Sequence, residues 1–102
     1  MQTQVEYQEA MVNDVKVSPK QIAYLYKKYS DHYQGRVKLV ADLEHADPYF
    51  IVEHDPGYNI QDHYVWMDKD GMWHCNCTGY HTRKWCCHIF AVLFERGYRF
   101  VM

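Results

Sequence analysis

The clearest pattern of hydrophobic and polar positions runs from Ser18 to Gly35. Apolar and aromatic residues recur there every three or four positions and so share one helical face: Ile22, Leu25, Tyr26, Tyr29 and Tyr33. Ser18 suits the N-cap and Pro19 the first helical position, and Gly35 is a typical C-terminal stop. We therefore expect an N-terminal amphipathic helix whose tyrosine-rich face packs in the core, with a docking surface as the less favoured interpretation.

Alternating hydrophobic positions predict strands in the middle of the chain. Residues 36–43 show this alternation, and residues 48–54 and 62–68 are also predicted to be strands. Turn-forming residues occupy 55–59, and the Lys-Asp-Gly sequence at 69–71 is typical of a tight hairpin, after which Met72 begins a return strand. A further strand is expected within residues 5–17.

After Cys86 the periodicity becomes helical. Four apolar residues form pairs at four-residue spacing: Ile89 with Leu93, and Phe90 with Phe94. The first helix breaker is Gly97, so a short helix with a wide apolar face is expected to end there, with Glu95 and Arg96 facing water.

These elements together predict an α+β protein. Its small antiparallel hairpins would combine with the amphipathic N-terminal helix and with a ββα-like unit at the C-terminal end. The 102 residues are enough for one domain and not for two. Within that domain, residues 1–47 form an N-terminal helix and strand region, and residues 48–102 form the C-terminal unit.

Composition and charge narrow the class of protein. Hydrophobic residues make up 48% of the chain, which argues against disorder. The formal charge is −2, but residues 71–102 carry four basic residues against one acidic residue, so the C-terminal end is locally positive. The sequence shows no signal peptide and no apolar run long enough to span a bilayer. An intracellular, reducing compartment is therefore expected.

All four cysteines lie between Cys75 and Cys87. Cys75 and Cys77 are two residues apart on an extended segment, so both side chains can face one ion. Cys86 and His88 stand at the start of the C-terminal helix, where the helix dipole favours a thiolate. Three thiolates and one imidazole form the closed tetrahedral set of a structural zinc site, so one Zn²⁺ is predicted to staple this unit.

Other chemistries fit the cysteine cluster less well. Disulfides are disfavoured by the adjacent Cys86 and Cys87 and by the lack of an export signal. The Cys-x-x-Cys sequence of redox catalysts and the His-x-Glu of zinc deaminases are both missing. Cys87 is interpreted as a small apolar core residue. His74 alternates away from the cysteines, and His81 is expected to face solvent or a partner.

The order of these motifs resembles the SWIM-type zinc finger: Cys-x-Cys, a short loop, and Cys-x-His leading into an apolar helix. A tryptophan-bearing hairpin, YVWMDKDGMWHCNC, precedes the loop, and CCHIFAVL is similar to the Cys-x-His-Ile-x-Ala-Val ending of that family. The resemblance implies that Cys75, Cys77, Cys86 and His88 are the zinc ligands. The family usually has a lysine or arginine where Cys87 stands. Nothing in residues 1–43 contributes to the resemblance.

The loop at residues 78–85 is the candidate binding surface. It carries side chains that can hold phosphates or stack on bases: Tyr80, His81, Arg83, Lys84 and Trp85. An alternative is that Trp85 packs under the metal and the two cations are ordinary surface charges. SWIM modules are regarded as DNA-binding or protein-binding, so the resemblance implies a small DNA-associated factor for recombination or transposition.

The sequence leaves two further classes of function open. A protein-interaction adaptor, such as a partner of a RecA-like recombinase, would use the tyrosine-rich helix and make no DNA contact. A nuclease site built from Asp62, His63, Asp68 and Asp70 is disfavoured because no motif with a known mechanism supports it. We therefore expect a binding module, not an enzyme, with no membrane and no small-molecule substrate among its partners.

Overall fold

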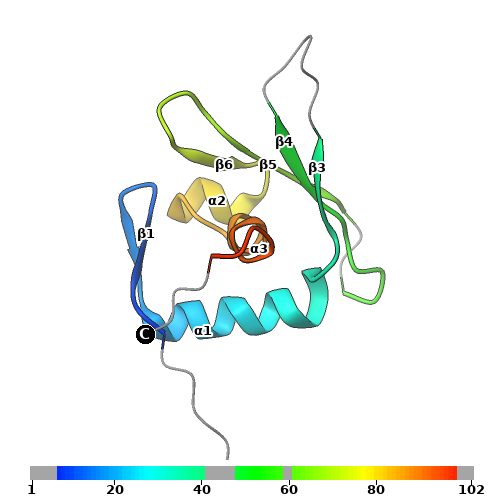
Figure 1. Cartoon of the computed structure of the whole chain (residues 1–102), viewed down its shortest axis with the longest axis horizontal. Helices are drawn as coiled ribbons and strands as arrows, with labels where there is room; N and C mark the ends of the chain where they lie inside the picture. The colour runs from blue at the N-terminus through cyan, green and yellow to red at the C-terminus, as the bar shows by residue number, and fades with distance from the viewer. Residues whose placement is uncertain (1–6, 41–47, 59–60, 99–102) are drawn as a thin grey trace, which may run out of the picture.

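The computed structural model describes residues 7–40, 48–58 and 61–98. Its helices and two antiparallel sheets confirm the predicted α+β class (Figure 1). No helix in these three ranges has the length and apolar character that crossing a membrane requires.

The larger sheet is an antiparallel meander in which chain order equals spatial order. Its strands are β3 (Val37–Val40), β4 (Tyr49–Val52), β5 (His63–Met67) and β6 (Trp73–Cys75). The predicted strands are confirmed with shorter bounds, and residues 41–43 lie outside the described part. Alternation sets the two faces, because Val65 is fully buried whereas Tyr64 and Trp66 beside it are exposed.

The turn between β5 and β6 is closed by one carboxylate. Asp68 Oδ1 accepts hydrogen bonds from the backbone N–H groups of Asp70 at 2.9 Å and Met72 at 3.0 Å. Gly71 follows with a φ of +83°, a value that glycine adopts without steric cost. The predicted hairpin is thereby confirmed, and its register brings Cys75 opposite Val65 at the end of β6.

Helix α3 (Cys87–Glu95) lies at the centre of the molecule. Figure 1 shows it end-on between α1 (Pro19–Lys28) and the four-stranded sheet. Every residue from 88 to 94 is buried, so the helix is enclosed on all sides and not only along the predicted apolar face. Glu95 is exposed, yet it does not simply face water, because its carboxylate accepts a hydrogen bond from the Tyr29 hydroxyl at 2.5 Å.

Helix α1 begins where the sequence predicts. Ser18 and Gln21 form a reciprocal capping box at its N-terminus. The predicted face is buried at Ile22, Leu25, Tyr29 and Tyr33, and half-buried at Tyr26. The helix ends in a π-helical segment, η1 (Tyr29–Tyr33), which the sequence pattern did not indicate.

The N-terminal segment forms a hairpin where a single strand was predicted. Strand β1 (Ala10–Val12) pairs with β2 (Val15–Val17) across a two-residue turn. Asn13 and Asp14 have φ angles of 53° and 63°, as a turn of this length requires. Asparagine and aspartate tolerate this left-handed conformation better than other residues with side chains, which explains why the chain reverses here.

The Asn13 side chain joins this hairpin to the C-terminal half. Its Nδ2 donates to the carbonyl oxygens of Trp73 and Lys84, each at 2.7 Å. Its Oδ1 accepts from the Trp73 N–H, also at 2.7 Å. One amide therefore satisfies both backbone groups of a β6 residue and holds the end of α2 (Thr78–Arg83) beside them.

We expect Asn13→Gly to lower the free energy of unfolding by about 1–3 kcal/mol, because it leaves partly buried backbone groups of Trp73 without partners. Glycine keeps the left-handed turn, so the change isolates the amide's hydrogen bonds. Urea denaturation measures the effect. Asp14→Gly, at the neighbouring turn position, is the matched control. Equal stability of the two variants would contradict the interpretation.

Candidate metal centre

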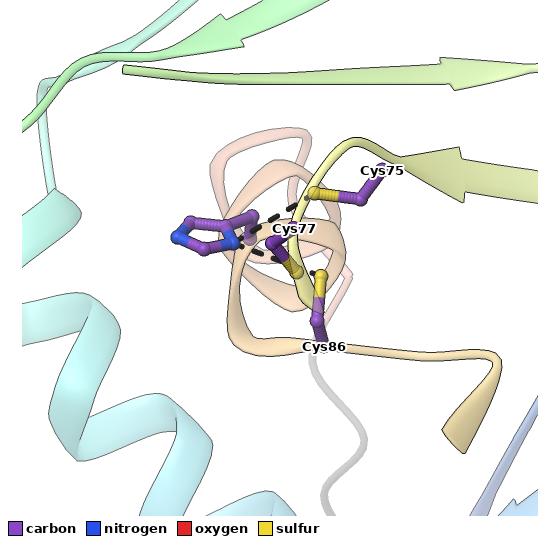
Figure 2. Close-up of side chains that lie close together, drawn as sticks. Cys75, Cys77 and Cys86 are labelled. Atoms are coloured by element: carbon purple, nitrogen blue, oxygen red, sulfur yellow. Dashed lines mark hydrogen bonds between the residues drawn. The ribbon is translucent and has the colours of Figure 1, made fainter. Parts of the chain in front are cut away.

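The structure brings the four predicted ligands together. Cys75 ends β6, Cys77 is the N-cap of α2, Cys86 is the N-cap of α3, and His88 lies in the first turn of α3. Their ligand atoms all lie within 4.8 Å of one another. Figure 2 shows the sulfur atoms of Cys75, Cys77 and Cys86 pointing toward one another from three separate elements.

The spacing of the ligand atoms fits a tetrahedral ion. His88 Nδ1 lies 3.7 Å from the Cys75 sulfur and 3.8 Å from the Cys86 sulfur. Tetrahedral zinc, with bonds of about 2.3 Å to sulfur and about 2.0 Å to nitrogen, places these atoms about 3.5 Å apart. Three sulfurs and one imidazole nitrogen at this spacing could hold one metal ion.

Extended backbone at two cysteines turns their side chains inward. Cys77 has φ −90° and ψ 160°, and Cys86 has φ −157° and ψ 171°. The Cys77 sulfur also accepts the Tyr80 N–H at 3.4 Å, so it caps a helix as well as joining the cluster. Residues 78–85, predicted as a loop, contain α2, and Lys84 ends that helix in a left-handed conformation with φ 68°. A cysteine N-cap is not among the residue types that usually signal a helix start.

The thiol and imidazole groups of the cluster shift one another's pKa values. Hydrogen bonds from Cys75 and Cys86 hold the pKa of the Cys77 thiol far below its usual value. For the Cys86 thiol the effect is opposite: its hydrogen bonds with Cys75 and Cys77 raise its pKa well above the usual value. Burial disfavours the charged form of His88, but its hydrogen bonds to Cys75 and Cys77 raise its pKa to about 11. A metal ion bound here would replace the protons that these groups carry.

Two aromatic side chains orient the His88 ring. The Tyr33 hydroxyl lies 3.5 Å from Nε2, the ring nitrogen that faces away from the sulfurs. His63 stacks on the ring with centroids 3.8 Å apart and planes 18° apart. Such outer contacts fix which nitrogen of a histidine faces the metal. Nothing in the sequence indicated that either residue contacts the cluster, because one comes from η1 and the other from β5.

His74 faces away from the cluster, as its position on the strand predicts. Its Nε2 lies 2.7 Å from Asp68 Oδ2, and its Nδ1 lies 2.8 Å from the Tyr80 hydroxyl. The hydrogen bond from His74 holds the pKa of Asp68 below its usual value. The Trp66 ring stacks on the His74 ring, with the two ring centroids 5.4 Å apart. His74 thus links the hairpin turn to α2.

Cys87 stands outside the group of four ligands and packs half-buried against the core, close to its predicted role. Burial alone would raise the pKa of its thiol, but the hydrogen bond to His88 and the nearby charges of His88 and Lys28 lower it. Of the two adjacent cysteines, Cys86 is the one that reaches the cluster.

The other residues predicted for binding divide by exposure. Trp85 is only 7% exposed and packs edge-on against Phe90, so its ring belongs to the core. His81, Arg83 and Lys84 are exposed. None of the ion pairs found within the described ranges involves Arg83 or Lys84. The Arg83 guanidinium lies 4.7 Å from the Trp85 ring centroid.

No protein-family model, curated protein or solved structure matches this chain. The likeness to SWIM fingers therefore rests on the motif residues themselves. The fold and the cluster define the class: a small α+β protein with a Cys₃His group that could hold a metal ion.

We expect Cys87→Ala to keep about one metal ion per chain and Cys86→Ala to lose it, because only Cys86 completes a tetrahedral set. Metal analysis of purified protein measures the stoichiometry, and circular dichroism of the same samples measures folding. The two variants delete neighbouring thiols and so control for each other. Metal loss from Cys87→Ala alone would mean that the ligand set is wrong.

Tyr33→Phe is expected to weaken metal binding about 10- to 100-fold, as removal of an outer partner of a histidine ligand typically does. Competition with a chromophoric chelator measures the affinity. Tyr29→Phe is the matched control, since its hydroxyl bonds Glu95 away from the cluster. Equal affinity of the two variants would exclude a role for the Tyr33 hydroxyl at the metal.

Proposed function

We propose that this protein is a small zinc-stabilised module that binds DNA. Soft thiolate donors disfavour magnesium and calcium, and three sulfurs with one imidazole are a donor set typical of structural zinc. Cys75, Cys77, Cys86 and His88 would hold the ion and leave no coordination position for water or substrate. The proposal therefore assigns the chain no catalytic activity.

The role of the ion in this proposal is to support the fold. Its ligands stand at the end of β6 and at the starts of α2 and α3, so the ion would join three elements beside the core. The free energy of binding such an ion contributes directly to folding. What the module does then depends on the surface that these elements present.

The observation that carries the DNA proposal is the exposure of two cations, one on the last residue of α2 and one on the residue after it. Arg83 and Lys84 are exposed and form none of the ion pairs found in the described ranges. Tyr80 lies beneath Lys84, whose Nζ is 6.0 Å from the ring centroid, and His81 is exposed alongside. Exposed cations next to aromatic side chains suit phosphates and bases.

A protein-interaction adaptor is the second candidate function. It is favoured by a surface other than the one around Arg83 and Lys84. A groove of about 750 Å³ lies between the sheet and the C-terminal end of α3. Leu39 is 61% exposed there and Met67 is 42% exposed. Large apolar side chains left in a groove are typical of sites that bind another protein.

We expect Arg83→Ala combined with Lys84→Ala to weaken DNA binding about tenfold at low salt and to reduce the salt dependence by one to two phosphate contacts. Fluorescence anisotropy of zinc-loaded protein at about 50 and 200 mM salt measures both quantities. Lys38→Ala combined with Lys69→Ala removes the same charge from the sheet and is the matched control. If wild-type protein binds no DNA at low salt, the adaptor is the better candidate.

A further inference from the structure

A second groove, of about 300 Å³, lies between α1 and the chain from Arg83, at the end of α2, to Cys87, at the start of α3; it is called the α1–α2 groove below. Tyr24 and Lys28 line it from α1, and Arg83 and Trp85 line it from the other side. The groove therefore combines the cation already assigned to DNA binding with residues about sixty positions earlier in the chain. Sequence reasoning placed no binding role on these α1 residues except a general docking surface.

Tyr24 is the exposed aromatic residue of this groove. Its side chain is 64% exposed, whereas Tyr29 and Tyr33 further along are 7% and 2% exposed. The core therefore does not account for Tyr24. It stands one helical turn before Lys28, so the ring and the ammonium group lie on the same helix face. An exposed ring next to a cation is the arrangement on which unpaired bases stack.

Lysine and arginine face each other across the groove, and the thiol of Cys87 lies between them in its lining. Its described lining residues include the cations of Lys28 and Arg83 and no carboxylate. Lys27, the residue before Lys28, is held by Asp31 at 2.8 Å. Lys28 instead lies over the Tyr58 ring, 5.2 Å from its centroid. Two cations on opposite walls suit the backbone phosphates of a strand that crosses between the helices.

Arg83 is held in place before any ligand arrives. Its guanidinium lies over the Trp85 ring at 4.7 Å, which leaves the edge of the group free to donate hydrogen bonds. The guanidinium also lies close to the backbone of α2, since a Cβ at Gly79 would be 2.7 Å from Arg83 Nη2. A cation fixed in this way loses little conformational entropy on binding phosphate.

We propose that the α1–α2 groove binds single-stranded nucleic acid, with a base stacked on Tyr24 and its flanking phosphates on Lys28 and Arg83. This inference rests on the proposed function and adds the form of nucleic acid and the second wall of the site. Single strands are favoured over duplex because only unpaired bases present a face for stacking.

The test compares a fluorescent oligo-dT strand with a hairpin duplex in anisotropy titrations of zinc-loaded protein. Tyr24→Ala weakens oligo-dT binding about fivefold or more and changes duplex binding less than twofold. Tyr24→Phe, which keeps the ring, binds as wild type does. Tyr64→Ala, which removes a tyrosine that is 43% exposed on the sheet, is the matched control and leaves binding unchanged.

Lys28→Ala tests the second wall. It lowers the dependence of log affinity on log salt by about 0.7, the value for one phosphate contact on a single strand. Lys27→Ala is the matched control, because that neighbouring ammonium group is already held by Asp31. Circular dichroism and metal content of each variant confirm that the protein remains folded and loaded.

The outcomes separate this inference from the proposed function. If Arg83→Ala with Lys84→Ala weakens binding while Tyr24→Ala and Lys28→Ala do not, the module binds DNA through α2 alone and the groove assignment is overturned. If wild-type protein binds neither strand nor duplex, both proposals fail. If poly-glutamate competes as well as oligo-dT and Tyr24→Ala has no effect, the groove serves an acidic protein partner instead.

Discussion

Three sulfur atoms and one imidazole nitrogen meet within 4.8 Å, and this convergence joins three elements of the fold. Thiolates at such short distances repel one another strongly once they are removed from water. The three cysteines therefore cannot all ionise without a cation among them. The ends of β6, α2 and α3 converge at this point. Whatever balances the charge of the cluster therefore also fixes where the central helix begins.

The central helix in turn explains why the N-terminal half is present. Because α3 is buried on all sides, one wall of its surroundings must come from α1, whose Ile22 and Leu25 are buried. The same helix continues into η1 and delivers the Tyr33 hydroxyl to His88. Residues 7–40 are therefore part of the environment of the cluster and not an appendage to it.

The parts that could be predicted from the sequence are those set by local spacing. Periodicity and turn residues located α1, α3 and the strands of the larger sheet, and cysteine spacing selected the four residues that the structure brings together. Contacts between distant residues were not predictable in this way: Tyr33 meets His88 across 55 positions, and Asn13 meets Trp73 across 60. Helix α2 was missed because its cap is a cysteine, and the role of Trp85 could be decided only from its burial.

The Asn13 amide has a consequence for how molecules of this protein meet. Strand β6 is the last strand of the larger sheet, and such a strand offers its free peptide groups to any chain that can extend the sheet. The Asn13 amide forms hydrogen bonds with the N–H and the carbonyl group of Trp73, as the backbone of an incoming strand would. The side chain that closes the fold on this side thereby also protects it against edge-to-edge aggregation.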